Sequence, residues 1–385
     1  MSARERLTGI IGSGMIGTDP YDPRSWSGSS RYFFRECDAQ GVLNRAFGVE
    51  LGPVQRLPFL LRNITLDRQL WRHRLYLDTG YYDALSQAIA SRIAPLDLEG
   101  GLLQIGGIFH LRPLLPGLAT IYSYHDGNLA QACKSPYFPA GITADRIARA
   151  VDYERRVYDS VDHIFTMSRY LKASFIEDFG VPESKVTVIG AGVNVEGIPE
   201  VTSRDFGAQQ ILFVGIDFHR KGGSEVLLAF RQVRRALPKA QLHIVGPSTL
   251  DIPVELRDGV TMHGFIAKNQ PEGRARMEAL LRAASLFVMP SLYEPFGIAP
   301  LEAMLYGVPC VLSEAGAFPE MVTPGVHGDL VPPRNPDRLA EVMIHLLGDP
   351  DALERMGAAG RVQVLRDFTW PAVVRKLRAT LGAAA

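Results

Sequence analysis

The second half of the chain alternates short apolar runs with longer helical stretches. One of these stretches, 224–237, begins at Ser224, a good N-cap, and ends before Pro238. Strands and helices in alternation predict a parallel sheet with both faces covered by helices. The runs of strand length are 211–215, 241–246, 286–290, 309–313 and 329–331.

The first half follows the same pattern less regularly. A helix is predicted from about Thr143, because a mostly apolar stripe recurs at 3–4 spacing, formed by Ile147, Val151, Glu154, Tyr158 and Val161. Such a stripe indicates that the helix packs on a sheet. Buried strands are predicted at 102–106, 119–124, 163–168 and 185–190.

A domain boundary is predicted at 190–199, where glycines are frequent, and in the polar run that continues to Gln210. The chain then divides into two domains, 1–200 and 201–368. Ligands of open parallel sheets bind beyond the carboxyl ends of the strands, so we expect the loops of both domains to face a central cleft. The predicted fold class is α/β, with two Rossmann-like parallel-sheet domains.

Composition narrows the class of protein. The 385 residues include 41 basic and 41 acidic side chains, so net charge gives no reason to expect nucleic-acid binding. Cys37, Cys133 and Cys310 lie far apart, which excludes a disulfide framework and a CxxC metal site and favours a cytoplasmic setting. The first ten residues do not resemble a signal peptide, and no run approaches the ~20 apolar residues of a membrane span.

Two glycine-containing segments near the N-terminus are candidates for phosphate binding. Gly12 to Gly17 matches GxGxxG, but two prolines follow within six residues and oppose the helix that a dinucleotide site needs. We interpret it as a glycine-rich loop that lines the cleft. Ser27 and Gly28 lead into a helix and could equally offer backbone N–H groups to a phosphate.

A literal DxD, which is the metal-binding signature of one class of transferases, occurs at Asp349-Pro-Asp351. It lies between two predicted helices near the C-terminus. We interpret Asp351 as an N-cap, so the sequence predicts no metal site there.

The stretch 290–309 carries two carboxylates. A strand ends at Pro290, Glu294 lies in the following loop with Gly297, and Pro300 fits the first turn of a short helix that stops at Gly307. Glu302 is placed in that first turn. Carboxylates accept paired hydrogen bonds from the neighbouring hydroxyls of a sugar, and free helix N–H groups hold anions. Glu302 alone is also explained as a charge that stabilises the helix dipole.

The stretch 213–224 carries two adjacent cations. A strand feeds a loop with Arg220 and Lys221, which Gly222 and Gly223 follow at a helix start. Cations beside a helix N-terminus suit a diphosphate. The alternative is a solvated basic turn.

With seven residues between them, Glu294 and Glu302 resemble the EX7E signature of family 4 of the retaining nucleotide-sugar glycosyltransferases, which have the GT-B fold. The loop from Gly215 to Gly222 is similar to the family's glycine-rich loop that ends in Lys-Gly. The resemblance covers 165–370 well and the first 160 residues loosely. It implies that 1–200 is the acceptor side, that 201–368 binds the nucleotide sugar, and that a helix in 369–385 crosses back to the N-terminal domain.

The resemblance also implies a role for each candidate residue. Glu294 would bind the transferred sugar, Glu302 the ribose and Lys221 the diphosphate. His125, which follows a strand of the first domain, would reach the sugar, and with Glu294 and Lys221 it forms the predicted catalytic set. The remaining donor-binding residues are expected to be Gly215, Arg220, Phe265, Ile266, Phe296, Gly297 and Ile298.

The sequence departs from the family at Ile216, where an arginine is usual. Either Arg220 supplies the second positive charge, or phosphate binding is weaker. The implied reaction moves a sugar from a nucleoside diphosphate to an acceptor hydroxyl with retention, without cofactor or metal. The acceptor would be a polysaccharide, a glycolipid or a small glycoside. The competing classes are an NDP-sugar epimerase and a catalytically silent sugar-nucleotide binder.

The segment 56–74 is strongly basic, with five arginines against the single acid Asp67. Its apolar residues could lie on an anionic bilayer at the inner membrane face or meet a lipid-linked acceptor. The alternative, which we favour from the sequence, is a packed surface helix with a solvated basic face.

Overall fold

The computed structural model describes residues 6–12, 19–96, 98, 100–118, 120–201 and 204–383. Of the glycine-rich loop predicted at 12–17, only Gly12 belongs to the described residues. The contacts divide the chain into two compact units. The first unit comprises the described residues of Met1–Gly192 and Trp370–Ala385, and the second comprises those of Val193–Thr369.

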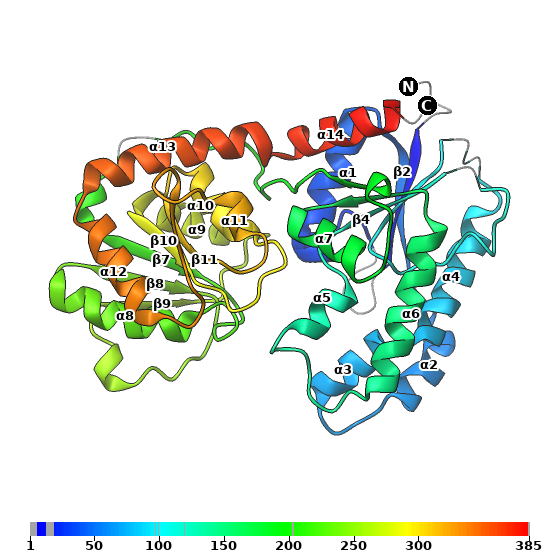
Figure 1. Ribbon diagram of the computed structural model, residues 1–385, viewed down its shortest axis with the longest axis horizontal. Helices are drawn as coiled ribbons and strands as arrows, with labels where there is room; N and C mark the ends of the chain where they lie inside the picture. The colour runs from blue at the N-terminus through cyan, green and yellow to red at the C-terminus, as the bar shows by residue number, and fades with distance from the viewer. Residues whose placement is uncertain are drawn as a thin grey trace. The chain divides into compact units, whose positions relative to one another are not determined.

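The first unit is built on a parallel sheet of six strands with the order β2-β1-β3-β4-β5-β6 (Figure 1). Its strands are β1 (Leu7–Gly12), β2 (Leu43–Val49), β3 (Leu102–Ile105), β4 (Ile121–His125), β5 (His163–Thr166) and β6 (Val186–Val188). Its helices are α1 (Ser29–Ala39), α2 (Pro53–Arg62), α3 (Arg68–Tyr76), α4 (Thr79–Ile93), α5 (Leu129–Lys134), α6 (Ala144–Ser160), α7 (Arg169–Glu177) and α14 (Trp370–Ala383).

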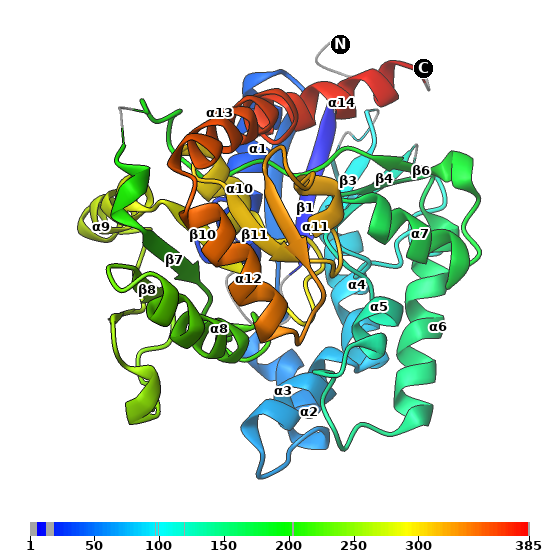
Figure 2. The same cartoon turned by 60° about the vertical axis from the view of Figure 1, so that its left-hand side comes forward.

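The second unit repeats this plan with the strand order β12-β11-β10-β7-β8-β9, again all parallel. Helices α8 and α12 lie side by side on the sheet (Figure 2). The strands are β7 (Gln210–Val214), β8 (Gln241–Val245), β9 (Val260–Gly264), β10 (Leu286–Met289), β11 (Cys310–Ser313) and β12 (Gly328–Val331). The helices are α8 (Gly223–Ala236), α9 (Pro271–Ala283), α10 (Ile298–Leu305), α11 (Phe318–Met321), α12 (Pro336–Leu347) and α13 (Pro350–Asp367).

The central strands are buried along their whole length, which explains why they appear as unbroken apolar runs in the sequence. Strands β3, β4, β10 and β11 are buried at every position. The predicted α/β fold with two Rossmann-like sheets is confirmed. Two edge strands were not predicted. Strand β2 is partly exposed along its middle, and β9 is nowhere fully buried, so neither carries a continuous apolar signal.

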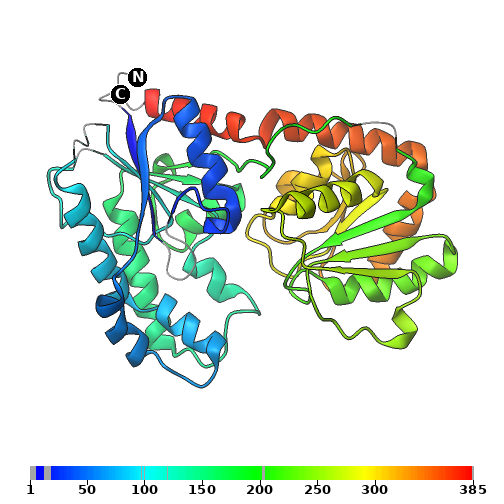
Figure 3. The same ribbon diagram turned by 180° about the vertical axis from the view of Figure 1, so that it is seen from behind.

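The C-terminal helix α14 packs on α1 of the first unit (Figure 3). The ring centroids of Phe33 and Trp370 are 5.7 Å apart, and the side chain of Gln40 donates to the carbonyl oxygen of Pro371 at 3.2 Å. The backbone approaches closely at this place, because a Cβ on Gly192 would lie 2.4 Å from the backbone nitrogen of Trp370. Glycine at 192 therefore permits the contact.

Two local predictions are corrected. The N-cap of α13 is Asp349, whose carboxylate accepts from the N–H of Ala352 at 2.9 Å, and Asp351 lies in the first turn. The DxD is thus a helix start, as expected, although the capping residue is the first aspartate. The basic segment 56–74 lies in two helices, α2 and α3, because Asp67 caps a new helix. Among the described residues, no helix is long and apolar enough to cross a membrane.

Candidate functional site

The loop between β10 and α10 carries Glu294 and is held in a tight turn. Gly297 has a φ of +92°, and a Cβ there would lie 2.7 Å from Cε1 of Phe318. A Cβ on Gly316 would lie 1.7 Å from the carbonyl oxygen of Glu294. Both positions therefore require glycine, and the close approach fixes the backbone on either side of the Glu294 carboxylate.

Helix α10 begins at Ile298, earlier than its proline suggests. Glu302 is therefore the fifth residue of the helix, and its prediction in the first turn is wrong. The explanation of Glu302 as a stabiliser of the helix dipole loses its basis, because that effect fades beyond the first turn. The N-cap of α10 is Gly297, which has no side chain that could accept hydrogen bonds from the first N–H groups of the helix.

Glu294 is buried and paired with a cation. Only 6% of the residue is exposed, and its carboxylate contacts the ammonium group of Lys221. Ser291 donates a long hydrogen bond of 3.4 Å to the same oxygen, and the guanidinium of Arg220 lies 3.9 Å away. The structure thus brings together the three charged residues that the sequence predicts for this region.

The loop between β7 and α8 delivers Lys221 to this position. Gly222 has a φ of +78°, and a Cβ there would lie 2.2 Å from the carbonyl oxygen of Pro290. The loop is thereby pressed against the end of β10. Helix α8 begins directly afterwards at Gly223, and its N-terminus also lacks a side-chain cap. Two uncapped helix starts, those of α8 and α10, therefore flank neighbouring loops of the same sheet.

Arg220 connects the two loops. Its guanidinium donates to the carbonyl oxygen of Tyr293 at 2.9 Å and to the carboxylate of Asp217 at 2.9 Å. Its own carbonyl accepts from the N–H of Leu292 at 2.8 Å. Ile216, where the family usually has arginine, is exposed. Arg220 therefore holds the Glu294 loop against the Lys221 loop.

Glu302 has a partner that the sequence analysis missed. The ammonium group of Lys268 lies 2.7 Å and 2.8 Å from the two carboxylate oxygens of Glu302, which is also 6% exposed. Lys268 follows β9 in the loop that contains Phe265 and Ile266. Phe265 is exposed, whereas Ile266 is buried. Each buried glutamate of the motif thus has its own lysine.

His125 lies in the first unit, as the last residue of β4. Its ring is 1% exposed and makes edge contacts with Tyr158 and Phe175, at centroid distances of 5.4 Å and 5.0 Å. Burial lowers the pKa of His125 to about 3, so the imidazole is neutral at ordinary pH. Its Nε2 has no hydrogen-bond partner among the residues that the structure describes.

The predicted loop at Ser27 and Gly28 also lies in the first unit and has an unusual backbone. Trp26, Ser27 and Gly28 all have positive φ, at 46°, 55° and 88°. Non-glycine residues in this conformation are strained and need support from their surroundings. The ring of Trp26 makes an edge contact with Tyr124, which places the turn beside the end of β4.

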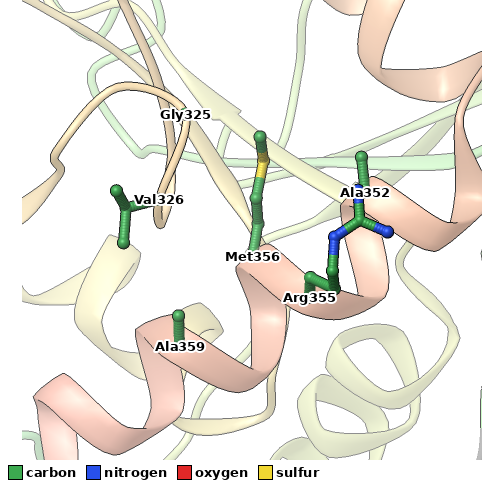
Figure 4. A pocket seen from close by; sticks show the side chains of 6 residues that line it. All are labelled: Gly325, Val326, Ala352, Arg355, Met356 and Ala359. Atoms are coloured by element: carbon green, nitrogen blue, oxygen red, sulfur yellow. The ribbon is translucent and has the colours of Figure 1, made fainter.

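A shallow hollow of about 260 Å³ lies elsewhere in the second unit (Figure 4). None of the predicted site residues lines it. The residues around it are Gly325, Val326, Ala352, Arg355, Met356 and Ala359. In the described part of the chain, no three His, Cys, Asp or Glu side chains gather in a cluster that could hold a metal ion.

Two parallel α/β units of this topology define the GT-B class of glycosyltransferases, and comparisons with solved structures agree. The structure matches a sucrose-phosphate synthase from Thermosynechococcus elongatus with a TM-score of 0.73 and 19% identity over 99% of this chain and 100% of that one. It also matches HepE of Anabaena in complex with UDP-glucose, with a TM-score of 0.64 and 15% identity over 98% and 100%. These likenesses show the fold.

Sequence comparisons define the family. The model described as Glycosyl transferases group 1 matches residues 196–363, and the model described as Glycosyltransferase Family 4 matches residues 104–196. An uncharacterized glycosyltransferase of Methanocaldococcus jannaschii is 30% identical over 286 residues, which are 65% of this chain and 70% of that protein. The chain therefore belongs to the glycosyltransferase family that these models describe.

A glycogen synthase of Mycobacterium tuberculosis is 32% identical over 216 residues. These residues are 55% of this chain and 52% of the relative, so the match spans about half the length of that protein.

Proposed function

We propose that this glycosyltransferase moves a sugar from a nucleoside-diphosphate sugar to an acceptor hydroxyl with retention at the anomeric carbon. The observation that carries the proposal is the pair of buried glutamates, Glu294 and Glu302, each facing a lysine in the second unit. Carboxylates suit the neighbouring hydroxyls of a sugar and a ribose, and the lysines supply positive charge beside them. The family membership of the chain supports the same reaction class.

The roles divide between the two pairs. Glu294 binds the hydroxyls of the transferred sugar, and Lys221 binds the diphosphate. Glu302 binds the ribose, and Lys268 holds its carboxylate in place. The backbone N–H groups of Phe296, Gly297 and Ile298 meet the sugar and phosphate, because the start of α10 has no side-chain cap.

The nucleotide contacts are assigned to two further loops. Gly215 allows the β7–α8 loop to approach the phosphates, since a Cβ there would lie 2.9 Å from Cγ of Lys221. The backbone around Phe265 and Ile266 contacts the nucleobase. Arg220 adds positive potential 3.9 Å from the Glu294 carboxylate while it clamps the loops.

In the reaction, the bond from the anomeric carbon to the leaving phosphate oxygen breaks, and a bond from the acceptor oxygen forms on the same face. The leaving phosphate oxygen takes the acceptor's proton, so no separate base is needed. Lys221 and the helix N–H groups stabilise the charge that develops on the diphosphate. The enzyme uses no cofactor and no metal in this scheme.

His125 is assigned a hydrogen bond to a sugar hydroxyl in this proposal, and one feature of its imidazole supports that role. A buried polar atom without a hydrogen-bond partner destabilises the fold unless a ligand or water pairs with it. The Nε2 of His125 is such an atom among the described residues. A sugar hydroxyl would satisfy it.

A uridine-diphosphate sugar is the first donor to test, because HepE, which has a similar fold, was crystallised with UDP-glucose. The acceptor is a carbohydrate or a lipid-linked sugar, bound by 1–200 with the strained turn at Ser27 and Gly28 as a candidate contact. The cysteines are free, which fits a cytoplasmic enzyme.

A thermal-shift panel of UDP, GDP, ADP and their sugars tests donor binding, because a bound ligand raises apparent stability by mass action. Release of nucleoside diphosphate should then depend on an added acceptor. Interconversion of the donor without acceptor would indicate an epimerase. Binding without hydrolysis or transfer would indicate a silent sugar-nucleotide binder.

A further inference from the structure

Helix α2 has two apolar faces, and only one of them packs on the part of the protein that the structure describes. Phe59 and Leu60 pack against the hydrophobic core of the first unit, and Asn63 behind them is fully buried. Asn63 is anchored by hydrogen bonds to the carbonyl oxygen of Phe59 at 2.8 Å and to the carboxylate of Asp78 at 2.6 Å. This inner face fixes which side of α2 points outward.

The opposite face forms the outer stripe, and each of its five large apolar residues is between 51% and 107% exposed. Three of them recur at helical spacing along α2, and two continue the stripe into the connection to α3. Scattered exposed apolar residues are common, but a contiguous group of this kind marks an interaction surface. The residues of the outer stripe are Val54, Leu57, Leu61, Ile64 and Leu66.

The surroundings of the outer stripe are basic. Arg68 and Arg72 are exposed on α3, whereas Arg62, half exposed at the end of α2, is paired with the carboxylate of Asp78. The single acid of the segment, Asp67, is engaged by the N–H groups of Gln69 and Leu70 as the cap of α3. In a chain with 41 basic and 41 acidic side chains, this is a local excess of positive charge.

We propose that the outer stripe and its arginines form a docking surface for an anionic lipid bilayer. The apolar side chains would enter the boundary between headgroups and acyl chains, and the arginines would contact the lipid phosphates. A second copy of this chain is a poorer occupant, because a symmetric contact would set arginines against arginines. The favoured expectation from the sequence, a basic face in solvent, does not account for an outward face that is apolar.

Trp71 offers a native reporter next to this surface. Its indole N–H donates to the carbonyl oxygen of Leu60 at 3.1 Å, which fixes the ring against α2. Docking on vesicles that contain brominated lipid should quench its fluorescence, and the variant Trp71→Phe should remove that quenched component. The other two tryptophans of the chain, Trp26 and Trp370, provide the unquenched background.

The decisive experiment is cosedimentation of the full chain with two kinds of vesicle, phosphatidylcholine alone and phosphatidylcholine with one third phosphatidylglycerol. We expect binding to the anionic vesicles only, and weaker binding as salt rises past ~0.15 M. The double variant Leu57→Ser/Leu61→Ser should lower the partition coefficient at least about tenfold. Arg68→Gln/Arg72→Gln should lower it and remove most of the salt dependence.

A matched control removes equally exposed apolar side chains elsewhere. Val254 and Val362 in the second unit are 76% and 63% exposed, so Val254→Ser/Val362→Ser should bind like the natural chain. Unchanged melting temperatures in all variants would show that they fold. Absence of binding to anionic vesicles, or an equal loss in the control, would overturn the proposal. So would a concentration-dependent dimer that the Leu57/Leu61 variant abolishes, which would assign the surface to a second copy. None of these readouts depends on glycosyl transfer.

Discussion

Two sets of titratable groups, one in each unit, are stabilised in different ways. In the second unit, Glu294 and Glu302 are buried opposite lysines. In the first unit, His125 on β4 is buried and Glu154 on α6 is half-buried, and among the described residues neither has an opposite charge beside it to stabilise its ionised form. Burial lowers the pKa of His125 to about 3 and raises the pKa of Glu154 to about 7, against a hydrogen bond from the N–H of Leu129 that favours the carboxylate.

The two sets of groups are therefore expected to respond differently to ligands and to pH. A buried carboxylate that faces a lysine can accept hydrogen bonds from hydroxyls while the lysine also contacts a phosphate. A buried group without such a partner responds to pH, because its charge is disfavoured by the surroundings. The comparison therefore predicts that pH acts on the stability of the first unit and that charge removal acts on ligand binding by the second.

The largest expected effect is on stability. Because the folded pKa of Glu154, about 7, lies above its ordinary value of 4.5, the folded state favours the protonated form, and stability falls as pH rises between these values. Glu154→Gln should abolish this loss, which is about 3 kcal/mol for the full shift. Urea denaturation of both proteins at pH 5 and pH 8 measures the difference.

Glu177→Gln, at an exposed position of α7, is the matched control and should leave the pH dependence unchanged. His125 changes stability in the opposite direction. Because burial lowers its pKa in the folded state to about 3, the free energy of unfolding decreases as pH falls from 6.5 towards 3. This contribution is common to both proteins and cancels in their difference. Identical pH slopes for Glu154→Gln and the natural chain would remove the contrast between the units.

The second prediction concerns the donor. Glu294→Ala should lower kcat/KM for the nucleotide sugar by about 10- to 100-fold, since a hydrogen bond to a charged group contributes about 1.5–3 kcal/mol. Binding of the bare nucleoside diphosphate, measured by calorimetry, should change much less. Glu314→Ala, at an exposed position after β11, is the control. A loss of nucleotide binding as large as the loss of kcat/KM would show that the roles of the two glutamates are exchanged.

A smaller effect is expected at the newly found lysine. Lys268→Met should weaken binding of the bare nucleoside diphosphate by about three- to tenfold, because Glu302 would lose the cation that orients it. The variant should also lose preference for the ribose over the 2′-deoxyribose form of the nucleotide, whereas Lys268→Arg should retain part of it. A variant that binds both nucleotides as the natural chain does would assign Lys268 to stability alone.

No effect is expected from chelation. Lys221, the potential of Arg220 and two helix starts can balance the roughly two negative charges of a diphosphate. Transfer should therefore survive exhaustive treatment with EDTA, followed by assays with and without magnesium or manganese. Loss of activity that either metal restores would overturn the mechanism. Asp217, 2.9 Å from the guanidinium of Arg220, would then be the first ligand to examine.

Much of the fold could be predicted because its central strands are buried on both faces. Short unbroken apolar runs that lie between helical stretches, such as those of β3 and β10, indicate buried strands. Edge strands are partly exposed, so they lack such apolar runs. The half-exposed β9 has no continuous apolar run and was not predicted. Glu302 was placed in the first turn of α10 because the unusual φ of Gly297, which sets the start of the helix, has no signature beyond the glycine itself.

The candidate site was predictable where its residues are close in sequence. Glu294 and Glu302 lie on one loop and helix, and Lys221 lies beside a glycine pair. Lys268 is 34 residues from its partner, and a lysine in a turn usually lies in solvent, so only the three-dimensional structure reveals the ion pair. The residues of the outer stripe could not be predicted either. Helix α2 carries apolar residues all around, and the sequence does not show which of them pack inward.

The place of α14 in the first unit has a consequence for the order of folding during synthesis. The second unit is one continuous segment inserted into the first, and its ends meet where the N–H of Val193 donates to the carbonyl oxygen of Phe368 at 3.0 Å. The second unit can therefore close while the ribosome is still translating. The first unit, although its synthesis begins earlier, stays without the helix that covers Phe33 until α14 emerges after the second unit.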